Sequence, residues 1–151
     1  MADIDFEVDL EWSGTGRDGE GQARFPEHHV DVTYAGPEAM GGRGSGPSPE
    51  EFLMAAVSTC YSSTLFGLLR KAGLPVGRVS IRVEGKVTGY PMTAKFSLIR
   101  VHPEIHGGNP DAMDEYVRVA KEAREKCFIG KTIAGNVEYQ VGNVFVRASA
   151  N

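Results

Sequence analysis

Cysteine is scarce in this chain, because its 151 residues include two, Cys60 and Cys127. Two thiols cannot build the disulfide framework of a small secreted protein, and a chain of this length can bury a core without one. Their spacing does not form a Cys-x-x-Cys motif, which disfavours a thioredoxin-like redox site. In a reducing compartment the two thiols are expected to be reactive, metal-binding or simply buried.

The chain also lacks an excess of positive charge. It carries 16 Lys and Arg against 20 Asp and Glu, a formal net charge of −4, whereas binding to a phosphate backbone needs clustered basic side chains. No nucleic-acid partner is therefore expected. The first residues have neither the basic start nor the apolar stretch of a secretory signal, so a cytoplasmic location is expected.

Charged residues are missing from one long stretch, residues 52–69. Its length approaches the ~20 apolar residues that span a bilayer. Five serine and threonine residues interrupt its middle, however, so we expect a helix buried in a soluble protein rather than a membrane span. No membrane partner is predicted.

A phosphate-binding signature is absent as well. The Gly-rich run 36–47 lacks the Gly-Lys-Ser/Thr ending of a P-loop and the spacing of a dinucleotide fingerprint, so it is interpreted as a loop.

The residues after this loop carry the signals of a helix start. Ser48 is the expected N-cap, Pro49 occupies the first helical position and Glu51 completes a capping box. Gly73 marks the end of this helix.

The remaining patterns predict a mixed fold. Apolar residues alternate in 6–12, which predicts a half-buried strand, and further strands are expected at 22–25, 30–34, 79–83 and 94–105. Asn109-Pro110-Asp111 opens a second helix, whose apolar stripe ends at Cys127. Segments 137–141 and 144–146 predict a final strand or hairpin. The order favours one α+β domain over residues 1–151.

The simplest interpretation of each cysteine is a buried, inert thiol. Cys60 would lie in the middle of the long helix, where the helix dipole contributes little, so an activated Cys60 needs a cation from elsewhere in the fold. Cys127 fits the apolar stripe of the second helix. No histidine neighbours either cysteine in sequence, so neither a metal site nor a cofactor is predicted.

Several segments together resemble the OsmC/Ohr family. Residues Pro49-Glu50-Glu51-Phe52-Leu53-Met54-Ala55-Ala56-Val57-Ser58-Thr59-Cys60 resemble its signature, with Pro-Glu at the helix start and the reactive Cys ten residues after the Glu. Three further segments resemble the family and occur in the same order along the chain. They are the loop Gly16-Arg17-Asp18-Gly19, the Gly-rich residues 44–48 before the long helix, and the helix 120–127 with the residues 134–137 that lead to the last strand. After the second cysteine the family usually has Cys-Pro, with a Ser two residues beyond. This chain instead has Cys127-Phe128-Ile129-Gly130.

The resemblance implies an α+β fold in which antiparallel sheets pack around a long central helix, in an intertwined homodimer. It also implies a thiol peroxidase for organic hydroperoxides. Cys60 would attack the peroxide, Cys127 would form a disulfide with it, and a dithiol, in this family a lipoylated protein, would reduce that disulfide. Arg17 would stabilise the Cys60 thiolate, and Glu50 would orient Arg17.

Helix geometry adds one expectation about the dimer. Glu50 and Cys60 are ten residues apart, which is about 15 Å along a helix, so Arg17 cannot easily contact both in one chain. Antiparallel packing of two long helices would bring Glu50 of one chain near Cys60 of the other. The alternative to catalysis is a ligand-binding or structural dimer module with inert thiols.

Overall fold

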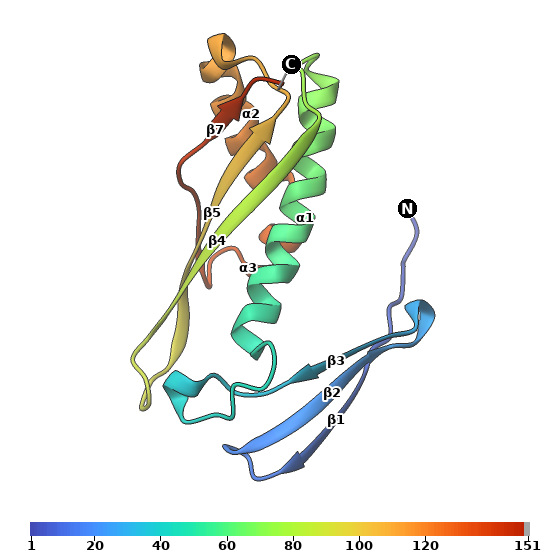
Figure 1. The fold of residues 1–151 in the computed structure, drawn as a ribbon, viewed down its shortest axis with the longest axis vertical. Helices are drawn as coiled ribbons and strands as arrows, with labels where there is room; N and C mark the ends of the chain where they lie inside the picture. The colour runs from blue at the N-terminus through green and yellow to red at the C-terminus, as the bar shows by residue number, and fades with distance from the viewer. Residues whose placement is uncertain (150–151) are drawn as a thin grey trace. The chain divides into compact units, whose positions relative to one another are not determined.

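The computed structural model describes residues 1–149 and has the expected α+β composition. The chain forms two compact units, Met1–Phe52 and a second that begins at Leu53, and each is described by itself. The long helix α1 (Pro49–Lys71) begins in the first unit and continues through the second (Figure 1). The expectation of a single domain stays a prediction.

The first unit contains an antiparallel sheet in the order β1-β2-β3, formed by Asp9–Gly14, Gly19–Phe25 and Val30–Tyr34. The hairpin between β1 and β2 pairs Gly14 with Gly19, so these strands extend further than expected into the predicted loop. Short 3₁₀ turns at Pro26–His28 (η1) and Glu38–Met40 (η2) bracket β3. The Gly-rich segment 36–47 is a loop, as its composition indicates.

The prediction for the first alternating segment is wrong in two respects. Residues before Asp9 are not in the strand, and every residue of β1 is exposed. Phe6 and Leu10 keep 86% and 61% of their side-chain surface. The alternation is real, but β1 is an edge strand whose apolar side chains stay exposed, even though the Trp12 ring lies 5.6 Å from the Tyr34 ring.

The start of α1 confirms the predicted capping box. The Glu51 backbone N–H donates to Ser48 Oγ at 3.3 Å, and the Ser48 N–H donates to Glu51 Oε1 at 3.2 Å. These bonds satisfy two backbone donors that the first turn of a helix otherwise leaves without partners. Because Ser48 is itself buried, the bonds also fix where the Gly-rich loop becomes helix.

The second unit pairs a sheet with helices on one face. Strands β4 (Arg78–Thr88) and β5 (Lys95–His106) form a long antiparallel hairpin. A 3₁₀ turn (η3, Pro110–Ala112), which Asn109 caps, leads into α2 (Met113–Lys126) and then α3 (Phe128–Ile133), a short helix that the sequence did not predict. Strands β6 (Glu138–Val141) and β7 (Phe145–Arg147) complete the sheet.

The last two strands correct two expectations. They do not form a hairpin, because both pair with β5, one after the other along its length. Both pairings are parallel, so this sheet is mixed rather than antiparallel. The chain reaches β6 through α2 and α3, and such a crossover connection is what parallel pairing requires.

The core lies between α1, α2 and β5. Four residues of α1 at helical spacing are fully buried, and the last three of them pack with α2 and with Val101 and Ile105 of β5. The four are Val57, Tyr61, Leu65 and Leu69. The helix is therefore buried along one stripe rather than on every side, because the sheet and α2 cover a single face.

Within residues 1–149, α1 alone is long and apolar enough to cross a membrane. Its buried stripe nevertheless packs as a core helix does.

Replacing the capping serine tests this local account. Ser48→Ala removes the bond to the Glu51 N–H and should lower the free energy of unfolding by about 1 kcal/mol in urea denaturation. Ser58→Ala is the matched control, because its hydroxyl bonds to the Met54 carbonyl within the helix. This control should change stability by less than about 0.5 kcal/mol. Equal effects of the two substitutions would contradict the cap assignment.

Candidate functional site at the two cysteines

Cys60 lies in the third turn of α1 and is half-buried. Its neighbours Val57 and Tyr61 belong to the buried stripe, and Cys60 itself packs against the core cluster that contains Cys127. The opposite side of this turn is exposed at Thr59 and Ser63. Cys60 is thus positioned at the border between the core and the uncovered face of the helix.

Cys127 lies at the junction of α2 and α3 and is fully buried. Its backbone N–H closes α2 by donating to the Ala123 carbonyl at 2.9 Å. Its Sγ caps α3 by accepting the Gly130 N–H at 3.4 Å, and it donates to the Val57 carbonyl at 3.8 Å. Val57 lies one turn before Cys60, so the capping sulfur of one helix contacts the backbone of the other.

The two thiols are therefore neighbours, as the resemblance implied, and both are free. Burial raises the pKa of the Cys127 thiol above its usual value, and the adjacent Cys60 thiol raises it further. The bond from the Gly130 N–H acts in the opposite direction, because it favours the thiolate. In the reduced protein Cys127 is accordingly held as a thiol at neutral pH.

Two tyrosines complete the surroundings of the thiols. The Tyr61 hydroxyl donates to the Ala120 carbonyl of α2 at 2.9 Å, in the core. The Tyr139 hydroxyl of β6 is buried and has no hydrogen-bond partner within residues 1–149. Burial raises the pKa of both tyrosines, and Cys127 adds to the shift in each, so both keep their protons. Sequence reasoning placed Tyr139 in a strand and missed this position.

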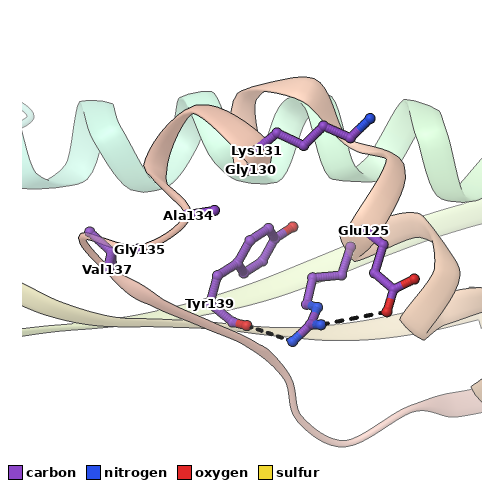
Figure 2. Close-up of a pocket in the computed structure, with 8 residues that line it drawn as sticks. Glu125, Gly130, Lys131, Ala134, Gly135, Val137 and Tyr139 are labelled. Atoms are coloured by element: carbon purple, nitrogen blue, oxygen red, sulfur yellow. Dashed lines mark hydrogen bonds and ion pairs between the residues drawn. The ribbon is translucent and has the colours of Figure 1, made fainter.

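Gly130 explains how Tyr139 fits beside Cys127. A Cβ atom on Gly130 would lie 2.5 Å from Cε2 of the Tyr139 ring, so the ring occupies the space that a side chain would take. Figure 2 shows the ring rising from β6 toward α3. Arg124 donates a hydrogen bond to the Tyr139 carbonyl at 3.0 Å. Gly130 and Tyr139 also line a pocket of about 330 Å³.

The first unit carries the other two predicted site residues. Arg17 is exposed, and its side chain crosses Gly41, where a Cβ atom would lie 3.2 Å from Arg17 Cδ. Its guanidinium makes no hydrogen bond or ion pair with any described residue, whereas Arg43 pairs with Asp18 at 3.4 Å. Glu50 Oε2 is buried without a hydrogen-bond partner. The Arg17–Glu50 pair is not formed in the single chain and stays a prediction.

The histidines offer no alternative site. Among residues 1–149, no three His, Cys, Asp or Glu side chains are grouped so that they could hold a metal ion. His102 is buried and satisfied, because its Nδ1 accepts the Asn143 N–H at 2.9 Å and its Nε2 lies 3.1 Å from Glu84 Oε2. That contact is the main reason why the pKa of Glu84 falls to about 2.

The arrangement is suited to reversible disulfide chemistry. Two free thiols from different elements lie together, one at the edge of the core and one inside it. An oxidised sulfur at Cys60 would have a second thiol beside it.

Comparisons with known proteins agree with this geometry. Residues 42–142 match the family model described as OsmC-like protein. The uncharacterized protein YmaD of Bacillus subtilis is 28% identical over 144 residues, covering 93% of this chain and 94% of YmaD.

Two solved structures have the same fold. The organic hydroperoxide resistance protein OsmC of Legionella pneumophila has a TM-score of 0.69 at 22% identity, over 98% of this chain and 100% of that one. An OsmC-like protein of Mycoplasma pneumoniae has a TM-score of 0.75 at 18% identity, over 96% and 99% of the two chains. At these identities the structural likeness concerns the fold.

The contact between Gly130 and Tyr139 can be tested by adding one methyl group. Gly130→Ala should lower the free energy of unfolding by about 1–3 kcal/mol, because the ring cannot remain where it is. Thr132→Ala, at an exposed position of the same helix, should change it by less than about 0.5 kcal/mol. Urea denaturation of the reduced proteins measures both. A Gly130→Ala protein as stable as its control would show that the ring is free to move aside.

Proposed function

Because the chain belongs to the OsmC-like protein family, we propose that it is a thiol peroxidase that reduces organic hydroperoxides to alcohols. The family is often linked to organic hydroperoxide resistance, and the Legionella relative carries that name. The observation that carries the proposal is the contact between Cys60 and Cys127 across α1 and α2. A peroxidase of this type needs one thiol to attack and another to resolve the product.

Cys60 is the attacking thiol in this proposal because it lies at the border of the core, whereas Cys127 is enclosed. The Cys60 thiolate attacks one peroxide oxygen, and the O–O bond breaks. Cys60 becomes a sulfenic acid, and the alkoxide leaves as an alcohol after taking up a proton.

Cys127 then restores the site in two further steps. Its thiolate attacks the sulfenic sulfur, the S–S bond forms, and the leaving hydroxide takes a proton to become water. An external dithiol reduces the disulfide by two exchanges and is itself oxidised to a disulfide. A lipoylated protein is the proposed source of that dithiol, and the cycle requires the reducing conditions of the cytoplasm.

Arg17 and Glu50 activate Cys60 from a second chain in this proposal. The face of α1 opposite its buried stripe carries small residues that allow a second helix to approach closely, and it is exposed at Ala55, Ala56, Ser63 and Gly67. Arg17 and Glu50 each have an unpartnered charged group in the single chain. An antiparallel pair of α1 helices would close this face and bring Glu50 of one chain toward Cys60 of the other.

Stoichiometric oxidation of the cysteine variants tests the assigned reaction. One equivalent of cumene hydroperoxide should remove both free thiols of the parent protein together. Cys60→Ser should remove no thiol and abolish turnover, because the nucleophile is absent. Cys127→Ser should react once and accumulate a sulfenic acid that dimedone traps, as mass spectrometry would show.

Other outcomes decide between the alternatives. Retention of both thiols in the parent protein would favour a ligand-binding or structural module. Normal peroxidase activity in Cys60→Ser would overturn the roles of the two cysteines. Parallel rates with hydrogen peroxide would measure the preference for organic hydroperoxides.

Mixed dimers test whether each site is shared between chains. Arg17→Ala and Cys60→Ser proteins should each be nearly inactive alone. A dimer that contains one chain of each should recover one intact site, because the Arg17 of one chain meets the Cys60 of the other. Differently tagged chains allow the mixed dimer to be purified, and sedimentation equilibrium checks its mass. Monomeric active protein, or a mixed dimer without recovered activity, would contradict the shared site.

A further inference from the structure

The Tyr139 hydroxyl is a buried donor that no step of the proposed cycle uses. We propose that Tyr139 is a further catalytic residue, whose O–H donates a hydrogen bond to the Cys127 sulfur when that sulfur becomes a thiolate. The inference rests on the proposed peroxidase cycle, because it assigns a role in its second and third steps. It also predicts a property of Cys127 that can be measured without peroxide.

The contacts of Cys127 differ between its two protonation states. As a thiol, Cys127 donates to the Val57 carbonyl at 3.8 Å. As a thiolate it has no proton to donate, so the carbonyl oxygen becomes an unfavourable neighbour. The sulfur then requires donors, and the Gly130 N–H at 3.4 Å supplies one. The Ile129 N–H also favours the thiolate, but backbone amides alone leave a fully buried anion poorly compensated.

Tyr139 is a side-chain donor that this position offers in addition to the backbone amides. The titratable groups that face Cys127 are Cys60 and Tyr61 from α1 and Tyr139 from β6. The Tyr61 hydroxyl already donates to the Ala120 carbonyl. Tyr139 lies close enough to Cys127 for the sulfur to raise the pKa of its hydroxyl, which therefore stays protonated and able to donate.

The local structure keeps this hydroxyl in place. The ring lies against Gly130, the residue whose N–H already contacts the Cys127 sulfur, and a side chain at Gly130 would displace it. The ring rises from β6 toward α3, with its hydroxyl at the end directed away from the strand (Figure 2).

The donor acts where the charge on Cys127 appears. During condensation, the Cys127 thiol loses its proton and its thiolate attacks Cys60. The S–O bond breaks, and the released hydroxide takes a proton to form water. During reduction, an external thiolate attacks Cys60 and Cys127 leaves as a thiolate. Tyr139 stabilises the same anion in both directions and keeps its own proton throughout.

Tyr139→Phe removes the donor and leaves the ring against Gly130. The midpoint for ionisation of Cys127 should rise by about one pH unit. The thiolate fraction would fall about tenfold, while the greater nucleophilicity of a more basic thiolate recovers part of the rate, so condensation should slow about threefold. The first step at Cys60 should keep its rate.

Tyr61→Phe is the matched control, because it also removes a tyrosine hydroxyl beside Cys127. Tyr61→Phe removes the buried bond to the Ala120 carbonyl, so this variant should melt at a lower temperature and condense at nearly the parent rate. The reduced Tyr139→Phe protein should melt at or above the parent temperature, because its hydroxyl has no partner to lose. Dimedone trapping at timed intervals after one equivalent of cumene hydroperoxide gives the condensation rates.

A second readout separates this inference from the proposed function. In Cys60→Ser protein, the ¹³Cβ chemical shift of Cys127 reports its ionisation as pH is raised, without any peroxide. Addition of Tyr139→Phe should move the midpoint upward by about one unit. An unchanged midpoint would overturn the role of Tyr139, whether or not the parent protein reacts with hydroperoxide. Failure of the parent protein to lose its thiols would instead overturn the peroxidase cycle.

Discussion

The contact between the third turn of α1 and the end of α2 determines the rest of the candidate site. Two side chains donate hydrogen bonds across this contact to backbone carbonyls. Tyr61 donates to the Ala120 carbonyl at 2.9 Å, and Cys127 donates to the Val57 carbonyl at 3.8 Å. Both bonds are buried, so the Tyr61 hydroxyl and the Cys127 thiol would lose their acceptors if the helices moved apart. The contact thereby fixes Cys60 beside Cys127. It also places α3 and β6 next, because the chain continues directly from Cys127 into both.

The same contact places polar groups in the core, where they cost stability. An unpartnered buried hydroxyl costs about 1–3 kcal/mol relative to a satisfied one, and Tyr139 is such a group. A chain selected for stability alone would place phenylalanine at this position. Burial similarly disfavours ionisation of Cys127, although disulfide exchange requires its thiolate. At this position the Tyr139 hydroxyl has no partner in the reduced protein, and the neighbouring Cys127 is kept from ionising. Both features cost stability, and such features are typical of functional sites.

Local signals in the sequence predicted what local physics decides. Ser48 and Glu51 identified the helix start because a capping box is formed by residues three apart, and the apolar stripe of α2 located Cys127 at its end. Strand pairing between segments that are distant in the sequence was harder to predict. The alternation in 6–12 was read as a buried face, but burial depends on what covers the strand. The parallel pairing of β6 with β5 and the place of Tyr139 beside the thiols depend on contacts across about 40 residues of sequence, which no local pattern records.

The positions of the unpartnered groups have a common consequence for assembly. Arg17 lacks a partner within the described chain, Glu50 Oε2 is buried without one, and one face of α1 remains open. The Glu50 side chain is half-buried and one of its carboxylate oxygens is enclosed without a donor, so Glu50 adds an argument for a missing contact. Arg17 has the opposite charge and belongs to the same unit of the chain. A second chain that closed the α1 face would exclude water around both, which would strengthen their attraction and direct the positive charge toward a thiolate. Dimerisation and thiol activation would then be one event, and an isolated chain would hold its two cysteines together without a cation to activate them.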